Sequence, residues 1–170
     1  MSEQSLLPLS SQGVQSALDK LGFATQIRFF DTVTATSQQA ADNIGCSLGQ
    51  IVKSIAFIVD DKPILVLTSG DQRVDDRKIA AHYGVGRKKV RVASPEEMVA
   101  IYGYAPGSMA PLAHRTPGIL IHSDETLQRF DILYAAGGAH NAIFPVTLEQ
   151  LIAMSGGELM DVVRLPVEGS

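Results

Sequence analysis

The chain has little cysteine, no long apolar segment and no basic start. Its 170 residues include one cysteine, Cys46, which cannot form an internal disulfide and therefore fits a reducing compartment. No apolar stretch approaches the roughly 20 residues that a membrane-spanning helix needs. The first five residues lack the basic region of a secretory signal peptide. We therefore expect a cytoplasmic protein with no membrane partner.

Familiar catalytic signatures are also absent. The sequence has no Gly-x-Ser-x-Gly elbow and no phosphate-binding loop that ends in Gly-Lys-Ser/Thr. The four histidines show neither the spacing of a metal-ligand pair nor a neighbouring cysteine cluster; they are His82, His114, His122 and His140. We therefore expect no metal site and no cofactor.

The order of the predicted elements favours an α+β fold. Capped or amphipathic segments predict helices that begin near residues 10, 37, 75, 94, 126 and 147. Apolar segments predict strands at residues 24–30, 51–59, 64–67, 90–92, 119–121, 132–136, 142–144 and 160–165, with a turn at 60–63. Because helices and strands do not alternate strictly, we expect a mixed, mainly antiparallel sheet with surrounding helices. Length and composition, with 45% hydrophobic residues, predict a single domain over residues 1–170.

The strand at residues 51–59 carries a lysine among apolar side chains. Since side chains alternate along a strand, Lys53 shares its face with four bulky hydrophobic residues. A cation in that position must reach solvent, find a partner or line a cavity. The residue pattern does not decide among these three possibilities for Lys53. If Lys53 lines a cavity, the expected ligand is anionic.

Basic residues concentrate in one segment, although the net charge of the chain is −4. Residues 73–91 hold seven basic and two acidic side chains, a net charge of +5, so the rest of the chain carries −9. This asymmetry indicates a surface that faces a polyanion, while a solvated helix and loop explain the charges equally well. The candidate contacts to a nucleic acid are Arg73, Arg77, Lys78, Arg87, Lys88 and Lys89.

Two loops could carry chemistry. Residues 107–111 begin with glycine and end with proline, and glycine permits close approach of main-chain N–H groups to an oxyanion. Residues 137–141 read Gly-Gly-Ala-His-Asn directly after an apolar strand. They can hold polar side chains over a pocket mouth, or form an ordinary hairpin turn.

Taken in order, these segments resemble a known family. The sequence runs from Ile-Val-Lys-Ser-Ile through Leu-Val-Leu-Thr-Ser-Gly-Asp-Gln-Arg-Val-Asp and a Gly-x-x-x-Pro loop to Gly-Gly-Ala-His-Asn. It is similar to the YbaK/ProX family of aminoacyl-tRNA editing domains, which also occurs as the editing insertion of bacterial prolyl-tRNA synthetases. The resemblance extends from about residue 25 to residue 163.

The resemblance implies a barrel-like sheet and an enzyme that hydrolyses the ester between a wrong amino acid and a tRNA, typically a proline-accepting tRNA. Lys53 matches the family's pocket lysine, and Gly107 and Pro111 match its Gly-x-x-x-Pro loop. His140 matches a histidine of branches that clear alanine or another small amino acid. The loop interior, residues 108–110, differs from the Gly-rich form of cysteinyl-specific deacylases.

The expected catalytic residues are therefore Lys53, Gly107 and His140. Lys53 would hold the terminal phosphate or ribose, N–H groups around Gly107 would stabilise the oxyanion, and His140 would position water or the amino group or act as general base. The expected substrate-binding residues are Ser54, Ser108, Met109, Ala110, Pro111, Gly138 and Asn141.

The expected partner is the acceptor end of an aminoacyl-tRNA, and an aminoacyl-tRNA synthetase is a second candidate. Two other functions remain open. One is a tRNA-binding module without catalysis, which would bind tRNA and leave the aminoacyl group in place. The other is an enzyme that forms a Schiff base through Lys53.

Overall fold

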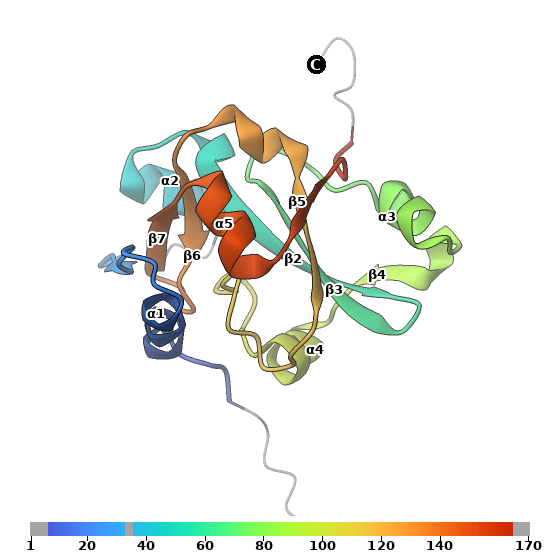
Figure 1. The fold of residues 1–170 in the computed structure, drawn as a ribbon, viewed down its shortest axis with the longest axis horizontal. Coiled ribbons are helices and arrows are strands. Elements are labelled where there is room, and N and C mark those ends of the chain that lie inside the picture. The colour runs from blue at the N-terminus through green and yellow to red at the C-terminus, as the bar shows by residue number, and fades with distance from the viewer. Residues whose placement is uncertain (1–6, 33–35, 165–170) are drawn as a thin grey trace, which may run out of the picture.

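The computed structural model describes residues 7–32 and 36–164, which form a mixed sheet with helices packed on it (Figure 1). The helices are α1 (Ser11–Lys20), α2 (Ser37–Ile44), α3 (Asp76–Tyr83), α4 (Pro95–Glu97) and α5 (Leu148–Ser155). The strands are β1 (Arg28–Phe29), β2 (Ile51–Val59), β3 (Lys62–Ser69), β4 (Val90–Val92), β5 (Leu120–Asp124), β6 (Leu133–Ala136), β7 (Ala142–Val146) and β8 (Glu158–Met160). Further helical segments are η1 (Leu48–Gln50), η2 (Arg87–Lys89), η3 (Met98–Tyr102) and η4 (Glu125–Arg129).

The sheet mixes both strand directions. Its strands follow the order β1-β7-β6-β2-β3-β5-β8, and β4 pairs with β2 outside this path. The pairs β1–β7, β2–β3, β2–β4 and β6–β7 are antiparallel, whereas β2–β6, β3–β5 and β5–β8 are parallel. The prediction of an α+β fold with a mixed, mainly antiparallel sheet is confirmed.

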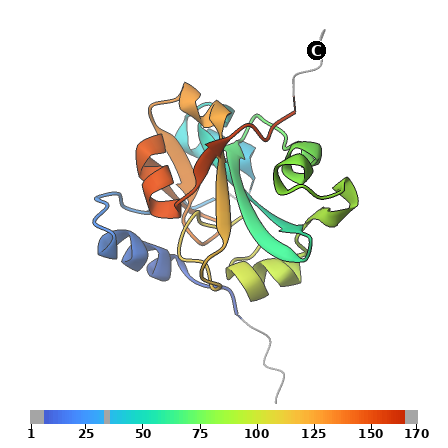
Figure 2. The same ribbon diagram turned by 45° about the vertical axis from the view of Figure 1, so that its right-hand side comes forward.

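Both faces of the central strands are covered. On β3, Leu65 and Leu67 belong to the core that contains Leu151 of α5, whereas Val66 belongs to a second core with Ile79 of α3. The two helices therefore lie on opposite sides of the sheet (Figure 2). This burial on both faces explains why β2 and β3 are nearly continuous runs of apolar residues.

The turn between β2 and β3 is tighter than the sequence suggested. Its two central residues, Asp60 and Asp61, have φ angles of 48° and 65°, as in the two-residue turn whose twist matches paired strands. Pro63 lies inside β3, opposite Ile58. The predicted turn over residues 60–63 is therefore too long by two residues.

Two predicted strands are wrong in extent because other groups take their main-chain hydrogen bonds. Only Arg28–Phe29 of the predicted segment 24–30 is a strand, and the Ile27 N–H donates to the Gln15 side chain at 2.9 Å. At the end of the chain the strand is Glu158–Met160, not residues 160–165. There the Val162 N–H donates to the buried Asp124 carboxylate at 3.0 Å, and residue 165 lies outside the described residues.

The predicted helix starts agree with the structure better than the predicted strand limits do, because helix starts depend on local capping residues. The capping boxes at Ser94 and Thr147 are both formed. The helix that begins after Ser94 continues as π-helical turns over Met98–Tyr102 and ends at Gly103 with a φ of 94°. In the described part of the chain, no helix combines the length and apolar character that crossing a membrane would require.

Candidate active site

Among the described residues, one edge of β2 is paired only near its two ends. Strand β3 pairs with β2 from Val52 to Val59 along the other edge. On the open edge, β6 pairs with Ile51 and Val52, and β4 pairs with residues 57–59. The positions between these two contacts face no neighbouring strand among the described residues. This break in the sheet is the feature on which the site is built.

Main-chain groups of Ser54 point into the break. The Ala93 N–H donates to the Ala56 carbonyl and the Asp60 N–H donates to the Lys89 carbonyl, each at 2.9 Å. Even-numbered residues of β2 therefore direct their N–H and C=O groups toward the β4 side, since these directions alternate along a strand. Ser54 follows the same pattern, and no described residue forms a hydrogen bond with its N–H or C=O on that side.

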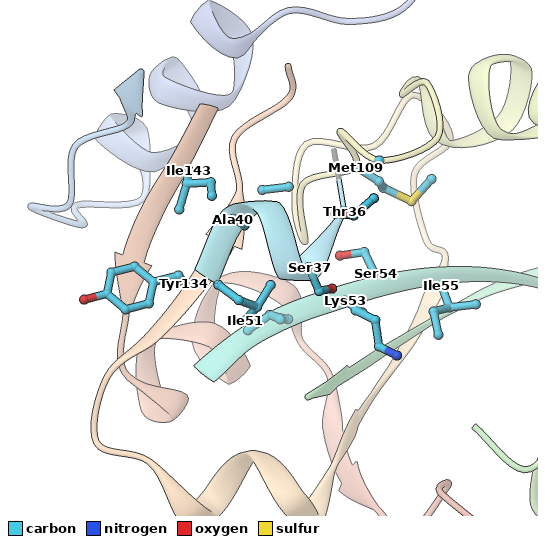
Figure 3. Close-up of a pocket in the computed structure, with 13 residues that line it drawn as sticks. Thr36, Ser37, Ala40, Ile51, Lys53, Ser54, Ile55, Met109, Tyr134 and Ile143 are labelled. Carbon is cyan, nitrogen blue, oxygen red and sulfur yellow. The ribbon is translucent and has the colours of Figure 1, made fainter. Parts of the chain in front are cut away.

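A cavity of about 300 Å³ lies at the break (Figure 3). Its walls come from α2, β2, the Gly107 loop, β6 and β7. The lining residues are Thr36, Ser37, Ala40, Ile51, Val52, Lys53, Ser54, Ile55, Gly107, Met109, Tyr134, Ala136 and Ile143. The cavity therefore combines an apolar wall with a lysine, hydroxyl groups and main-chain amides.

Helix α2 supplies the wall on one side. Its capping box joins Thr36 and Gln39, so the helix begins at the cavity, and Ala40 packs with Ile51 and Ile143 in a small apolar core. The small side chain of Ala40 keeps this side of the cavity open. Sequence reasoning did not include α2 in the site, although the Thr36–Gln39 spacing is a recognisable capping signal.

Lys53 is half-buried and has one described hydrogen-bond partner, the Gln72 carbonyl, at 2.6 Å from its Nζ atom. An ammonium has three N–H donors, so two are available to a ligand. Burial lowers the pKa of Lys53, the positive charge of Arg73 lowers this pKa further, and the Asp71 carboxylate opposes both. In Figure 3 the side chains of Lys53 and Ser54 leave β2 in opposite directions.

Polar side chains surround Lys53 on the β3 side of β2. Asp71 forms an ion pair with Arg129 at 2.7 Å, and the hydrogen bond from Arg129 holds the pKa of the Asp71 carboxyl below its usual range. Thr68, directly opposite Lys53 on β3, is fully buried, and its hydroxyl has no hydrogen-bond partner among the described residues. Sequence reasoning missed these supporting residues, because only the folded chain brings them together: Thr68 through the pairing of β2 with β3, and Arg129 through its ion pair with Asp71.

The Gly107 loop contributes two residues to the cavity. Gly107 has a φ of 84°, which favours glycine, and lies at the cavity wall with Met109. Ser108 is buried, and its hydroxyl donates to the Ala105 carbonyl at 2.8 Å. The next two residues, 110 and 111, are also buried and do not line the cavity. The five predicted loop residues are thus divided between cavity wall and core.

The predicted site residues in the turn between β6 and β7 do not line the cavity. Asn141 ties β1 to β7, since its Nδ2 atom donates to the Phe30 carbonyl at 3.0 Å. Gly138 has a φ of 93° and packs so closely on α1 that a Cβ atom there would lie 2.9 Å from Val14 Cγ2. His140 is exposed in the hairpin turn. The strands on either side reach the cavity through Tyr134, Ala136 and Ile143.

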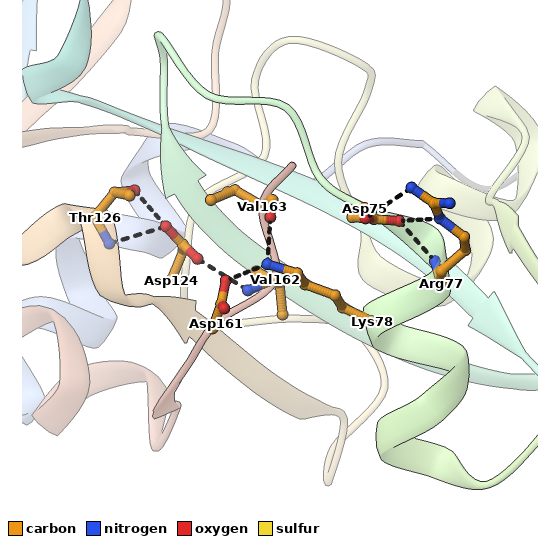
Figure 4. Close-up of polar contacts among 8 residues, drawn as sticks. All are labelled: Asp75, Arg77, Lys78, Asp124, Thr126, Asp161, Val162 and Val163. Carbon is orange, nitrogen blue, oxygen red and sulfur yellow. Dashed lines mark hydrogen bonds and ion pairs between the residues drawn. The ribbon is translucent and has the colours of Figure 1, made fainter. Parts of the chain in front are cut away.

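Three of the six candidate nucleic-acid-binding residues form ion pairs with carboxylates of this chain. Arg77 pairs with Asp75 at 3.2 Å, and Lys78 pairs with Asp161 at 2.7 Å and also donates to the Val163 carbonyl (Figure 4).

Arg87 pairs with Asp76 at 3.0 Å. In contrast, Arg73, Lys88 and Lys89 are exposed and have no ion pair with any described residue. Within residues 7–32 and 36–164, no group of three or more His, Cys, Asp or Glu side chains could hold a metal ion.

A second cavity, of about 340 Å³, lies at the far end of the β2–β3 hairpin. It is lined mainly by apolar groups of that hairpin, of Tyr83 and of residues 116–120. None of the predicted site residues contributes to it. Of the two cavities, the one at the β2 break is therefore the candidate active site.

Comparison with known proteins gives one consistent result. The family model described as "Aminoacyl-tRNA editing domain" matches residues 31–154. The chain is 31% identical over 150 residues to the uncharacterized protein YwhH of Bacillus subtilis (strain 168), with 86% of this chain and 92% of that protein covered. It is 32% identical over 93 residues to the proline–tRNA ligase of Staphylococcus aureus (strain Newman), with 55% of this chain and 16% of that enzyme covered.

The solved structures agree. A crystal structure of a candidate trans-editing enzyme for prolyl-tRNA synthetase superposes with a TM-score of 0.85 and 34% identity, covering 94% of this chain and 99% of that one. The predicted enzyme class, an aminoacyl-tRNA deacylase that takes aminoacyl-tRNA as its substrate, is confirmed. The chain belongs to the aminoacyl-tRNA editing domain family.

Proposed function

We propose that this chain, as one domain over residues 1–170, removes a small non-cognate amino acid such as alanine from a proline-accepting tRNA in trans. The observation that carries the proposal is the cavity at the β2 break, where Lys53, the Ser54 amide and Gly107 surround about 300 Å³. The likenesses to a proline–tRNA ligase and to a candidate trans-editing enzyme support the choice of tRNA. We place the protein in the cytoplasm, where tRNA charging takes place.

The reaction needs a water molecule, a polarised ester and a fixed tRNA end. Water adds to the carbonyl carbon, the tetrahedral oxyanion forms, and the bond from that carbon to the ribose oxygen breaks. The ribose oxygen takes the proton, and the products are free amino acid and tRNA. The vicinal hydroxyl of the terminal ribose can assist, since no described carboxylate lines the cavity.

In this proposal Lys53 and Gly107 bind different parts of the substrate. The Lys53 ammonium holds the terminal phosphate or ribose, with two donors available beyond its bond to Gln72. The N–H groups around Gly107 stabilise the oxyanion, an effect worth about 2.7–4 kcal/mol per well-placed donor. His140 lies outside the cavity wall, and its role as a catalytic residue stays a prediction that the His140→Ala variant tests.

The apolar wall sets the size of the amino acid. Ala40, Ile51, Tyr134 and Ile143 enclose this part of the cavity, which suits a short side chain. One methylene is worth about 1–3 kcal/mol in such a pocket, so discrimination among small amino acids will be incomplete. We therefore expect alanine to be accepted together with one or two close analogues.

A deacylation panel tests the proposal. Proline-accepting tRNA charged with alanine, serine, threonine, cysteine or 2-aminobutyrate is incubated with the wild type, Lys53→Ala and His140→Ala. We expect alanine to be released well above the spontaneous rate by the wild type and near that rate by Lys53→Ala. Binding of tRNA with no release of any amino acid would instead establish the non-catalytic module. Assays with and without prolyl-tRNA synthetase test whether a synthetase partner contributes.

A further inference from the structure

No described residue pairs with the main chain of Ser54 on the β4 side of β2. We propose that this main chain binds the aminoacyl group itself: the Ser54 carbonyl accepts a hydrogen bond from the α-ammonium, and the Ser54 N–H donates to the ester carbonyl oxygen. This inference rests on the proposed function and deepens it, because it states which main-chain groups recognise the α-amino group and the ester carbonyl of the substrate. It assigns Ser54 as a catalytic residue through its amide.

The break in the sheet lies between Val52 and Ala56 of β2. Pairing with β6 ends at Val52, and the next bond on this edge is made by Ala56, from Ala93. Ser54 is the one even-numbered position between them. In an antiparallel ladder each such position exchanges two hydrogen bonds with a single residue opposite it. The open position therefore has the length of one amino acid.

An aminoacyl group has the groups that this position requires. In an extended amino acid the nitrogen and the carbonyl oxygen point to the same side, as they do in a strand residue. The α-ammonium is a donor and the ester carbonyl is an acceptor, the complement of the Ser54 C=O and N–H. The substrate would thus take the place of a missing strand residue.

The surroundings favour this occupant over a longer peptide. Strands β6 and β4 already fill the positions on both sides of Ser54, so a longer strand cannot add to this edge. The apolar wall of Ile51, Ile143 and Tyr134 lies in the same cavity and can receive the amino-acid side chain. Two cations would repel each other, but the Lys53 ammonium is bound to the Gln72 carbonyl, away from Ser54.

The Ser54 N–H would also act on the reacting atoms. When water adds to the carbonyl carbon, the negative charge develops on the oxygen to which this N–H donates. The hydrogen bond strengthens in the transition state, and Gly107 is positioned in the same cavity to supply a further donor. The proton of the water leaves with the ribose oxygen, so Ser54 itself neither gains nor loses a proton.

The first experiment changes the substrate. Proline-accepting tRNA is charged with alanine or with lactate, which replaces the α-ammonium by a hydroxyl, and each enzymatic rate is divided by its spontaneous rate. The lactate hydroxyl can still donate a neutral hydrogen bond to the Ser54 carbonyl, so loss of the charge predicts an acceleration about 5- to 10-fold smaller for lactyl-tRNA. Equal acceleration of both esters overturns this proposal and leaves the proposed function intact. Failure to accelerate alanyl-tRNA overturns the proposed function, and this proposal with it.

The second experiment changes one main-chain atom. In the full-length Ser54→Ala variant, lactate is incorporated at position 54 by nonsense suppression, which replaces the N–H by an ester oxygen. Loss of one oxyanion donor predicts a kcat about 10²- to 10³-fold below that of Ser54→Ala. The matched control carries lactate in place of Ala56, which points to the same side but does not line the cavity.

Both ester variants weaken one carbonyl of β2 toward β3 in the same way, so they share any loss of stability. A fall in kcat at position 54 with activity retained at position 56 supports the proposal. Equal activities of the two variants contradict it. If the position 54 variant does not fold, the comparison of lactyl-tRNA with alanyl-tRNA still decides.

Discussion

At the scale of single residues, Lys53 combines a positive charge with partial burial. This combination shifts the pKa of its side chain, and the shift can be measured. Burial and the Arg73 guanidinium both lower the pKa of Lys53, and Asp71 opposes them. The ammonium therefore loses its proton at a lower pH than a free lysine does. We expect an NMR titration of the labelled Lys53 side chain to show a pKa below 10.5. Arg73→Ala should raise this pKa and Asp71→Asn should lower it further, whereas no response to Arg73→Ala would contradict the account.

We expect the Lys53 side chain to destabilise the folded state of the protein. Near neutral pH it is protonated in the folded and unfolded states alike, and burial disfavours the charged form in the folded state only. We expect Lys53→Met to have a thermal unfolding midpoint equal to or above that of the wild type while deacylation falls, as at sites where function opposes stability. Lys62→Met, at an exposed position of β3, is the control and should change neither quantity. A clear loss of stability in Lys53→Met would show that the lysine is structural.

At the scale of elements, local signals were predictable and long-range ones were not. The limits of β2 and the capping boxes at Ser94 and Thr147 follow from neighbouring residues, and the structure has them. The segment 24–30 has strand-like residues, yet the Ile27 N–H donates to the Gln15 side chain and the Thr25 hydroxyl donates to the Pro145 carbonyl. The sequence could not reveal these partners, because they lie 12 and 120 residues away.

The hairpin between β6 and β7 gives a test at this scale. Gly138 combines a φ of 93° with close packing on Val14 of α1, so a side chain there is strained on both counts. We expect Gly138→Ala to lower the free energy of unfolding by at least about 1 kcal/mol in urea titrations. Gly86→Ala is the control, since Gly86 has ordinary backbone geometry and open space around its Cα atom, and it should change stability by less than about 0.5 kcal/mol. Equal effects of the two substitutions would contradict the packing argument.

The site itself belongs to the scale of the whole molecule. Lys53, Ser54, Gly107 and Met109 could be selected from the sequence, and all four line the cavity. The wall from α2 could not, because no pattern in a single sequence indicates that α2 packs beside β2. The assignment of His140 as a catalytic residue stays a prediction, with the side chain placed outside the cavity wall.

Surface charge predicts how tRNA binding depends on salt. Arg73, Lys88 and Lys89 are exposed without ion pairs among the described residues, whereas Arg77, Lys78 and Arg87 are paired with carboxylates. Replacing the first three by alanine should reduce the slope of log affinity against log salt by about 1 for each lysine or arginine that contacts phosphate.

The second three form the matched control, and their replacement should reduce the slope less. Fluorescence anisotropy with labelled tRNA at several salt concentrations measures both slopes. Equal slopes for the two triple variants would contradict the assignment of the unpaired cations as the tRNA contacts.

The central claim is that the cavity at the β2 break hydrolyses aminoacyl-tRNA. Its most direct test is the rate of alanine release from alanyl-tRNA(Pro) by the wild type and by folded Lys53→Met under the same conditions. We predict release well above the spontaneous rate for the wild type and a rate about 10- to 150-fold lower for the variant, the range for one hydrogen bond to a charged group. Release at the spontaneous rate by the wild type, or equal rates for the two proteins, would contradict the account.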